Sequence, residues 1–155
     1  KHTLWEDSTR IPMIIRAPGV SQAGAKTRQP VSLIDLYPTL VDLCNLAGET
    51  RKNSQGAPLD GFSMRTLLEN PNVGEWDGPE GALTMRFAGP KNNKKPNQQH
   101  WAYRTERYRY ILYNDGNEEL YDHHNDPHEW RNLAENPAYS SLKTEYRQAI
   151  FKQIQ

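Results

Sequence analysis

Histidines and acidic residues are concentrated in one short stretch of this sequence, YDHHNDPHEW at residues 121–130. The side chains of types that bind metal ions are Asp122, His123, His124, Asp126 and His128. Their spacing matches neither the His-Glu-x-x-His pattern nor a Cys/His finger. Asp126-Pro127 is typical of a turn, and neighbouring side chains of a strand point to opposite faces. The stretch therefore favours a structural turn over a metal site.

Arginines are interleaved with aromatic residues in YRTERYRYILY at residues 103–113, a composition that could stack on RNA bases. Strand alternation explains the pattern equally well, because Tyr108, Tyr110 and Leu112 would share one face. The 19 basic and 19 acidic residues cancel. This neutrality argues against nucleic acid or an acidic membrane surface as a partner.

Motifs for nucleophilic catalysis or nucleotide binding are absent from the sequence. It contains no Gly-x-Ser-x-Gly, no P-loop, no Gly-x-Gly-x-x-Gly and no Cys/Ser-x-Pro-x-Arg. The single cysteine, Cys44, excludes an internal disulfide and a Cys-x-x-Cys metal site. Because Cys44 lies in an apolar pattern, the sequence predicts a buried thiol.

The length of 155 residues fits one domain, or one domain with two smaller cores. Hydrophobic residues make up only 35% of the chain, and the mean hydropathy is −0.92. We therefore expect a modest core, or a further face that is buried against something outside this chain. No apolar stretch approaches the length of a membrane span, so no membrane partner is expected.

The first half of the chain has the pattern of an α/β fragment. The apolar run Ile11–Ala17, ended by Pro18-Gly19, predicts a strand buried on both faces, as in a parallel sheet. A helix is predicted over Asp35–Ala47, with Asp35 as N-cap and Gly48 as the stop. Its apolar face would contain Tyr37, Leu40, Val41 and Cys44.

The second half predicts an antiparallel sheet with a covering helix. The predicted strands are Ala82–Ala88, His100–Arg104, Tyr108–Tyr113 and Glu118–Tyr121. Residues 114–117, with the sequence Asn-Asp-Gly-Asn, predict a hairpin turn. A terminal amphipathic helix is predicted over Tyr139–Ile154. Gly89–Gln99 is a long polar loop ending at His100, and such loops are often functional.

Four segments, in order, resemble the C-terminal part of the sulfatase family. They are KHTLWEDSTRIPMIIRAPG, VSLIDLYPTLVDLCNLAG, LDGFSMRTLLEN and RTERYRYILYNDGNEELYDHHNDPHEWRNLAENP. The last is similar to the tail of iduronate-2-sulfatase-like enzymes, which depend on formylglycine. The resemblance runs from Lys1 to about Gln148.

For the fold, the resemblance implies the end of an alkaline-phosphatase-like α/β layer followed by a small antiparallel sheet with a C-terminal helix. Residues 1–70 would be the last strand and helices of the catalytic α/β domain. Residues 71–155 would form the C-terminal antiparallel-sheet subdomain.

For function, the resemblance implies a fragment of a sulfuric ester hydrolase acting on a sulfated carbohydrate or similar ester. The family's formylglycine nucleophile and calcium ligands match nothing here, and Cys44 lacks the required proline two residues on. Calcium would therefore be held outside this chain, and the chain alone is expected to be inactive. Its partner would be an N-terminal catalytic segment or a separate chain. A periplasmic or secreted location is expected from the family.

Two residues are expected at the active site, as catalytic and substrate-binding groups. Lys1 matches a family lysine that reaches the sulfate, where an ammonium would neutralise developing charge. His100 matches a family histidine that could contact substrate or protonate the leaving oxygen. The loop Gly89–Gln99 would form a wall of the substrate pocket. No metal ligand is expected in this chain.

A second hypothesis is a non-catalytic interaction module derived from the same fold. Such a module would stand alone, with a dimer as one possible assembly, and would use surface that a catalytic sheet normally covers. In either case, an unpaired apolar strand at Ile11–Ala17 predicts association with a second copy or a partner chain.

Overall fold

The computed structural model describes residues 2–48, 51, 55–72, 76–89 and 95–154. The chain divides into two compact units. The first contains the described residues of 1–11 and 81–155, and the second those of 12–80. In the described residues, no helix is both long and apolar enough to cross a membrane.

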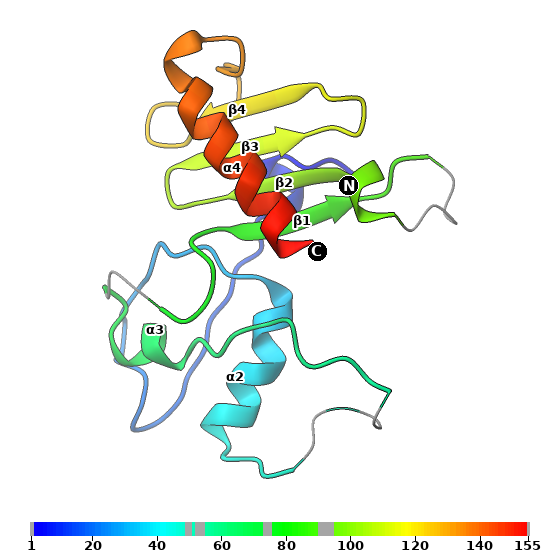
Figure 1. The fold of residues 1–155 in the computed structure, drawn as a ribbon. Coiled ribbons are helices and arrows are strands. Elements are labelled where there is room, and N and C mark those ends of the chain that lie inside the picture. The colour runs from blue at the N-terminus through cyan, green and yellow to red at the C-terminus, as the bar shows by residue number, and fades with distance from the viewer. Residues whose placement is uncertain (1, 49–50, 52–54, 73–75, 90–94, 155) are drawn as a thin grey trace. The chain divides into compact units, whose positions relative to one another are not determined.

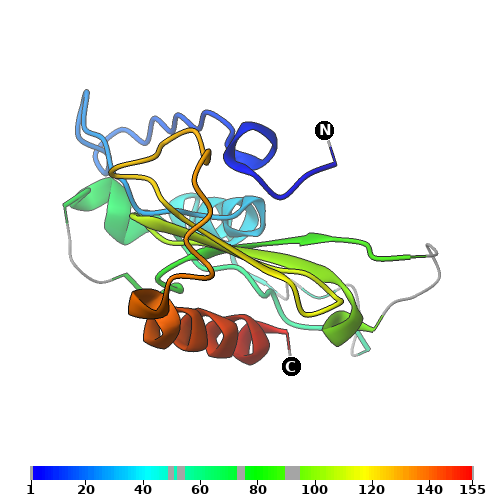
Figure 2. The ribbon, with the colours of Figure 1, turned by 90° about the horizontal axis from the view of Figure 1, so that it is seen from above.

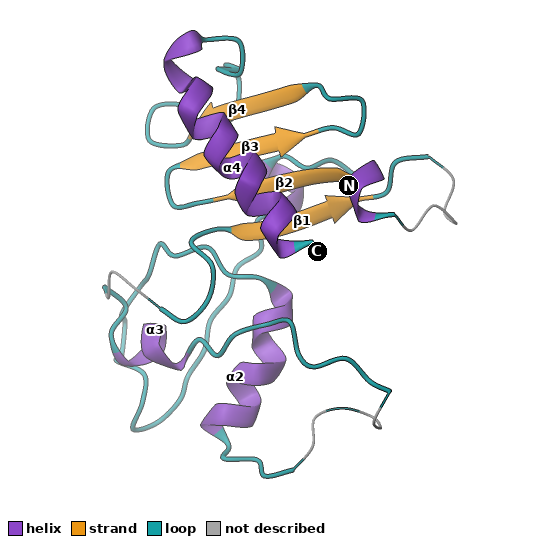
Figure 3. Ribbon diagram, in the orientation of Figure 1, coloured by secondary structure: helices purple, strands orange, loops and turns teal. Residues whose placement is uncertain are grey.

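The first unit is built on a four-stranded antiparallel sheet with the order β1-β2-β3-β4 (Figures 1 and 3). The strands are β1 (Ala82–Arg86), β2 (His100–Arg104), β3 (Tyr108–Leu112) and β4 (Glu118–Asp122). Each strand pairs antiparallel with the next along the chain. Short turns join β2 to β3 and β3 to β4, whereas residues 87–99 connect β1 to β2. The four predicted strands are thereby confirmed, with ends that differ by up to two residues.

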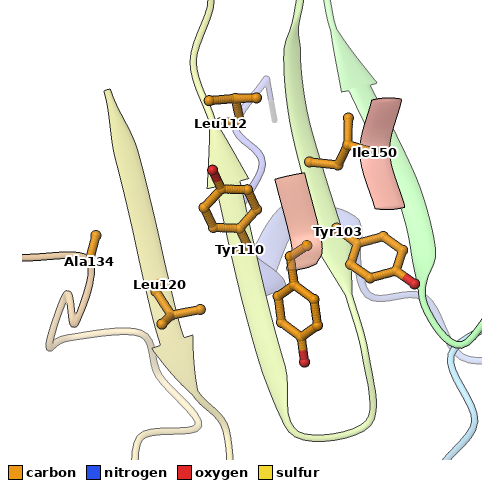
Figure 4. Close-up of a cluster of buried hydrophobic side chains, with 7 residues drawn as sticks. Tyr103, Tyr110, Leu112, Leu120, Ala134 and Ile150 are labelled. Carbon is orange, nitrogen blue, oxygen red and sulfur yellow. The ribbon is translucent and has the colours of Figure 1, made fainter. Parts of the chain in front are cut away.

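The C-terminal helix α4 (Ser140–Gln153) covers one face of this sheet (Figure 2). The short 3-10 helix η3 (Pro137–Tyr139) leads into it, with Asn136 accepting from the amide of Ala138. Tyr146 and Ile150 of the helix pack against the face of the sheet. The core between them, drawn in Figure 4, consists of Tyr103, Tyr110, Leu112, Leu120, Ala134, Tyr146 and Ile150.

Residues 2–9, which we call the strap, lie over the opposite face of the sheet (Figure 2). The strap contains the single-turn helix α1 (Glu6–Thr9). Leu4 of the strap is buried in a second cluster with Ala102, Ile111 and Tyr121. The sheet is therefore covered on both faces. Successive residues of β2, β3 and β4 point alternately into the core under α4 and into the cluster under the strap.

The second unit is held by short helices and polar contacts. It contains η1 (Leu33–Asp35), α2 (Leu36–Leu43) and α3 (Arg65–Glu69), and no strand among its described residues. The buried Asp35 carboxylate accepts from the amide of Ser32 at 2.7 Å and from that of Phe62 at 2.9 Å. These bonds fix the start of the helix and draw the chain before α3 against it.

Three sequence predictions for this unit are wrong. The run Ile11–Ala17 forms no strand, and Ile14 is 95% exposed. A strand needs the backbone of a neighbour, and the described residues of this unit offer none. The predicted helix ends at Leu43, four residues early. The thiol of Cys44 is exposed, because the apolar face of α2 faces solvent.

Candidate functional site

An open hollow of about 180 Å³ lies where the strap meets one end of the sheet. Its walls come from the strap, from the end of β1 and from the residue after β3. The lining residues are His2, Thr3, Leu4, Trp5, Arg86 and Tyr113. The hollow thus combines a cation, two aromatic rings and the polar groups of the strap.

The two aromatic walls are fixed by one carboxylate, that of Glu119 in β4. Its Oε2 accepts from the indole Nε1 of Trp5 at 2.7 Å, and its Oε1 accepts from the hydroxyl of Tyr113 at 2.9 Å. The hydroxyl of Tyr121 donates to Oε2 at 3.0 Å. Burial, with the hydrogen bond and charge of Glu119, raises the pKa of Tyr113 to about 12. Tyr113 is therefore a neutral phenol that holds its wall in place.

His100 stands beside this hollow, at the start of β2. Its Cα partner in β1 is Arg86, and its ring meets that of Tyr113 edge-on with centroids 5.3 Å apart. The backbone amide of Asn114 donates to His100 Nδ1 at 3.1 Å, so the neutral ring carries its proton on Nε2. Burial, and then the charge of Arg86, lower the pKa of His100 below its ordinary value.

Trp101 lies on the other face of the sheet from His100, as strand alternation predicts. It packs against the core under α4, and its Nε1 donates to the carbonyl of Pro96 at 2.8 Å. Pro96 begins the short 3-10 helix η2 (Pro96–Gln98). Neighbouring residues of β2 therefore serve opposite faces, with Trp101 in the core and His100 beside the hollow.

The strap is locked onto the sheet by a buried ionic network around Arg109. The guanidinium of Arg109 donates to Glu6, to Glu129 at 2.6 Å and to the carbonyl of Leu4 at 3.0 Å. Arg104 adds a second cation, with Nε 3.3 Å from a Glu6 carboxylate oxygen. The amide of Glu6 donates to Glu129 at 2.8 Å. This network fixes the residues that follow directly on Lys1 in sequence.

His123 completes the network by joining Arg104 to Glu129. A guanidinium can only donate, so Arg104 donates to His123 Nδ1 at 3.0 Å. The Nε2–H of His123 then donates to Glu129 at 2.8 Å. Burial alone would raise the pKa values of Glu6 and Glu129. Hydrogen bonds and the positive charge of Arg109 outweigh it and hold both pKa values below their ordinary range.

The calcium that the sequence resemblance implies does not fit the residues described here. Among the described residues, the possible ligand atoms of Glu6, His123 and Glu129 lie close enough together to hold a metal ion. Two guanidiniums already neutralise the carboxylates, and Ca²⁺ prefers six to eight oxygen ligands. The group is a structural ion-pair network.

The other residues of the histidine-rich stretch form a turn, as predicted. Asp126 accepts from the amides of Trp130 and Arg131 at 3.1 and 2.8 Å. The ring of His128 stacks on Trp130 at the surface, with centroids 5.0 Å apart. His124 is exposed.

Sequence reasoning singled out His100 but missed the residues that assemble its surroundings. Lys1 lies outside the described residues, and its neighbour His2 lines the hollow. The loop Gly89–Gln99 is described only in part, and at its end buried Gln99 accepts from the amide of Ala88 at 2.8 Å. Glu6, Arg109 and Glu129 carried no local signal, because their partners lie 20, 103 or 123 residues away in sequence.

The chain belongs to the family described as N-sulphoglucosamine sulphohydrolase, C-terminal, which matches residues 1–155. The fold is therefore that of a sulfatase C-terminal portion, as the sequence resemblance implied.

Similar proteins are themselves sulfatases. A protein of Formosa agariphila named "Sulfatase" is 31% identical over 141 residues, covering 91% of this chain and 24% of the relative. A Delta 4,5-hexuronate-2-O-sulfatase of Bacteroides thetaiotaomicron is 31% identical over 163 residues, covering 95% of this chain and 29% of the relative. The chain thus spans about a quarter of the length of these relatives.

A solved structure, that of a 2-O GAG sulfatase, is similar to this chain with a TM-score of 0.64 and 26% identity. The similarity covers 88% of this chain and 28% of the solved one.

Proposed function

We propose that this chain is the C-terminal part of a sulfuric ester hydrolase that acts on a sulfated carbohydrate, and that it forms one wall of the substrate pocket. The observation that carries the proposal is the convergence of the strap and His100 on one hollow. The strap begins directly after Lys1 in sequence, and its residues His2–Trp5 lie at the same end of the sheet as His100.

In this proposal, Lys1 and His100 bind the sulfate ester. The ammonium of Lys1 would neutralise the non-bridging oxygens. His100 would donate a hydrogen bond from Nε2–H, because its Nδ1 is already engaged by the amide of Asn114. We favour this contact over proton donation to the leaving oxygen, since a lowered pKa makes the imidazolium scarce near neutral pH.

The remaining catalytic groups would lie outside this chain. They are a formylglycine nucleophile and calcium, which would supply the attack on sulfur and charge neutralisation. The full protein would be periplasmic or secreted, as its family implies. This chain alone would turn over no sulfate ester.

The test is hydrolysis of 4-nitrophenyl sulfate and of sulfated disaccharides by the full-length protein. His100→Ala and Lys1→Ala should each lower kcat/KM. Lys152→Ala, in the helix that covers the opposite face of the sheet (Figure 2), should leave it unchanged. A full-length protein without turnover of any sulfate ester would overturn the proposal. If the isolated chain hydrolysed a sulfate ester, and Lys1→Ala left that activity unchanged, the nucleophile would not lie outside this chain as proposed.

A second function is favoured by the exposed apolar face of η1 and α2, which includes Leu33, Ile34, Tyr37 and Leu40. Such a face suits a non-catalytic interaction module that binds a partner chain or a second copy. Absence of a Cys/Ser-x-Pro-x-Arg motif from the gene that encodes this chain would favour this alternative over the hydrolase.

A further inference from the structure

The hollow beside His100 contains a cation that has no ion-pair partner among the described residues. Arg86 ends β1, lines the hollow and is exposed. Its side chain makes no ion pair or hydrogen bond with any residue that the structure describes. By contrast, Arg104 and Arg109 of the neighbouring strands are both paired with carboxylates. The positive charge at this end of the sheet is therefore available to a ligand.

The walls around Arg86 suit a sugar ring. The polar atoms of Trp5 and Tyr113 are already bonded to Glu119, so these residues offer their apolar ring surfaces to the hollow. Its volume of about 180 Å³ is below the roughly 300–1,000 Å³ of pockets that enclose drug-sized ligands. The space fits one ring with its substituents rather than a longer chain.

We propose that this hollow is a subsite for an anionic sugar residue adjoining the sulfate ester, and that Arg86 determines this specificity by pairing with a carboxylate or a second sulfate. The inference rests on the proposed function, because it takes the cleaved ester to lie beside His100. A guanidinium suits this task, since its planar fork donates two parallel hydrogen bonds to an oxyanion. Trp5 and Tyr113 would hold the ring that carries the anion.

The test is a binding titration of the full chain, followed through the NMR signal of the Trp5 indole N–H. The three probes are methyl β-D-glucuronide, methyl β-D-glucoside 6-sulfate and neutral methyl β-D-glucoside, which differ only at C6. The two anions should shift the Trp5 signal with affinities about tenfold or more above that of the neutral sugar, as expected for a charge-assisted bond. Tighter binding of the glucuronide would identify a carboxylate as the group that pairs with Arg86. Tighter binding of the 6-sulfate would identify a second sulfate as that group.

Arg86→Ala should remove the preference for the anions, and Arg86→Lys should retain part of it. The matched control is Arg131→Ala, which removes the same charge from an exposed residue outside the hollow. Equal binding of all three sugars, unchanged preference in Arg86→Ala, or no shift up to the solubility limit would each overturn the inference. Because the titration needs no turnover, its failure is distinguishable from an absence of sulfatase activity in the full-length protein.

Discussion

His100 and Trp101 are neighbours in β2 whose side chains serve opposite faces of the sheet. In the full-length protein, His100→Ala should lower kcat/KM and leave the thermal unfolding midpoint nearly unchanged, because this side chain lies at the rim. Trp101→Ala should do the reverse and cost about 2 kcal/mol of stability, less than for a fully buried ring, because Trp101 is half-buried. If His100→Ala unfolds the protein and Trp101→Ala does not, the assignment of the pocket to this face fails.

Arg109 is the residue on which the strap depends most, since it is 2% exposed and lies between Glu6 and Glu129. Arg109→Met would leave two largely buried carboxylates without their main cation and should cost about 3–5 kcal/mol at pH 7. Arg10→Met is the matched control, because the exposed Arg10 pairs with the same Glu6 at 3.9 Å. That surface pair should contribute at most about 1 kcal/mol. Urea unfolding of the two variants measures both, and equal losses would contradict a structural role for the network.

The same carboxylates make stability depend on acid pH. The pKa values of Glu6 and Glu129 are lower in the folded protein than their ordinary value of 4.5, so the folded state binds fewer protons than the unfolded state. Their stabilisation is therefore fully present above pH 4.5 and is lost as the pH falls below it. Asp122 extends the loss further, because its hydrogen bonds with Arg107 lower its pKa to about 2. Urea midpoints measured from pH 7 to pH 3 should fall steeply below pH 4.5, and a flat profile would contradict this linkage.

At the scale of elements, α4 stabilises the sheet through a few buried side chains. Ile150 is 0% exposed in the core under the helix, whereas the next residue, Phe151, is 36% exposed. Ile150→Ala should therefore cost about 2–4 kcal/mol, and Phe151→Ala less than about 1 kcal/mol despite the larger side chain. Denaturant unfolding compares the two. A larger loss for Phe151→Ala would mean that the helix is rotated about its axis.

The elements that sequence reasoning predicted well are those with local signals. Alternation and the hairpin turn at residues 114–117 located β2, β3 and β4, and amphipathic spacing located α4. The strand predicted at Ile11–Ala17 is wrong, because an apolar pattern does not supply the neighbouring strand that a sheet needs. The network of Glu6, Arg109 and Glu129 could not be predicted, since it depends on which distant residues the fold brings together. For the site, sequence resemblance supplied His100 but not the aromatic walls held by Glu119.

At the scale of the whole molecule, the second unit exposes more apolar surface than a solvated domain usually does. Leu33, Tyr37 and Leu40 are spaced four and three residues apart on one helical face, and each is more than half exposed. The isolated chain should therefore self-associate as its concentration rises. Tyr37→Lys with Leu40→Lys should shift it toward the monomer in analytical ultracentrifugation. Trp130→Lys, which removes a single 85% exposed aromatic, should have no such effect. A wild-type chain that stays monomeric would contradict this prediction.

The strap also constrains the order in which the first unit can fold. The sheet grows from neighbouring segments, so its loops close early and at low entropic cost. The bond between Glu6 and Arg109 instead joins residues 103 apart, and that between the Glu6 amide and Glu129 joins residues 123 apart. The guanidinium of Arg109 would be presented by β3 before its acidic partner arrives from the other end of the chain. We therefore expect docking of the strap to be the last step, so that the hollow beside His100 would form only in molecules whose sheet has already folded.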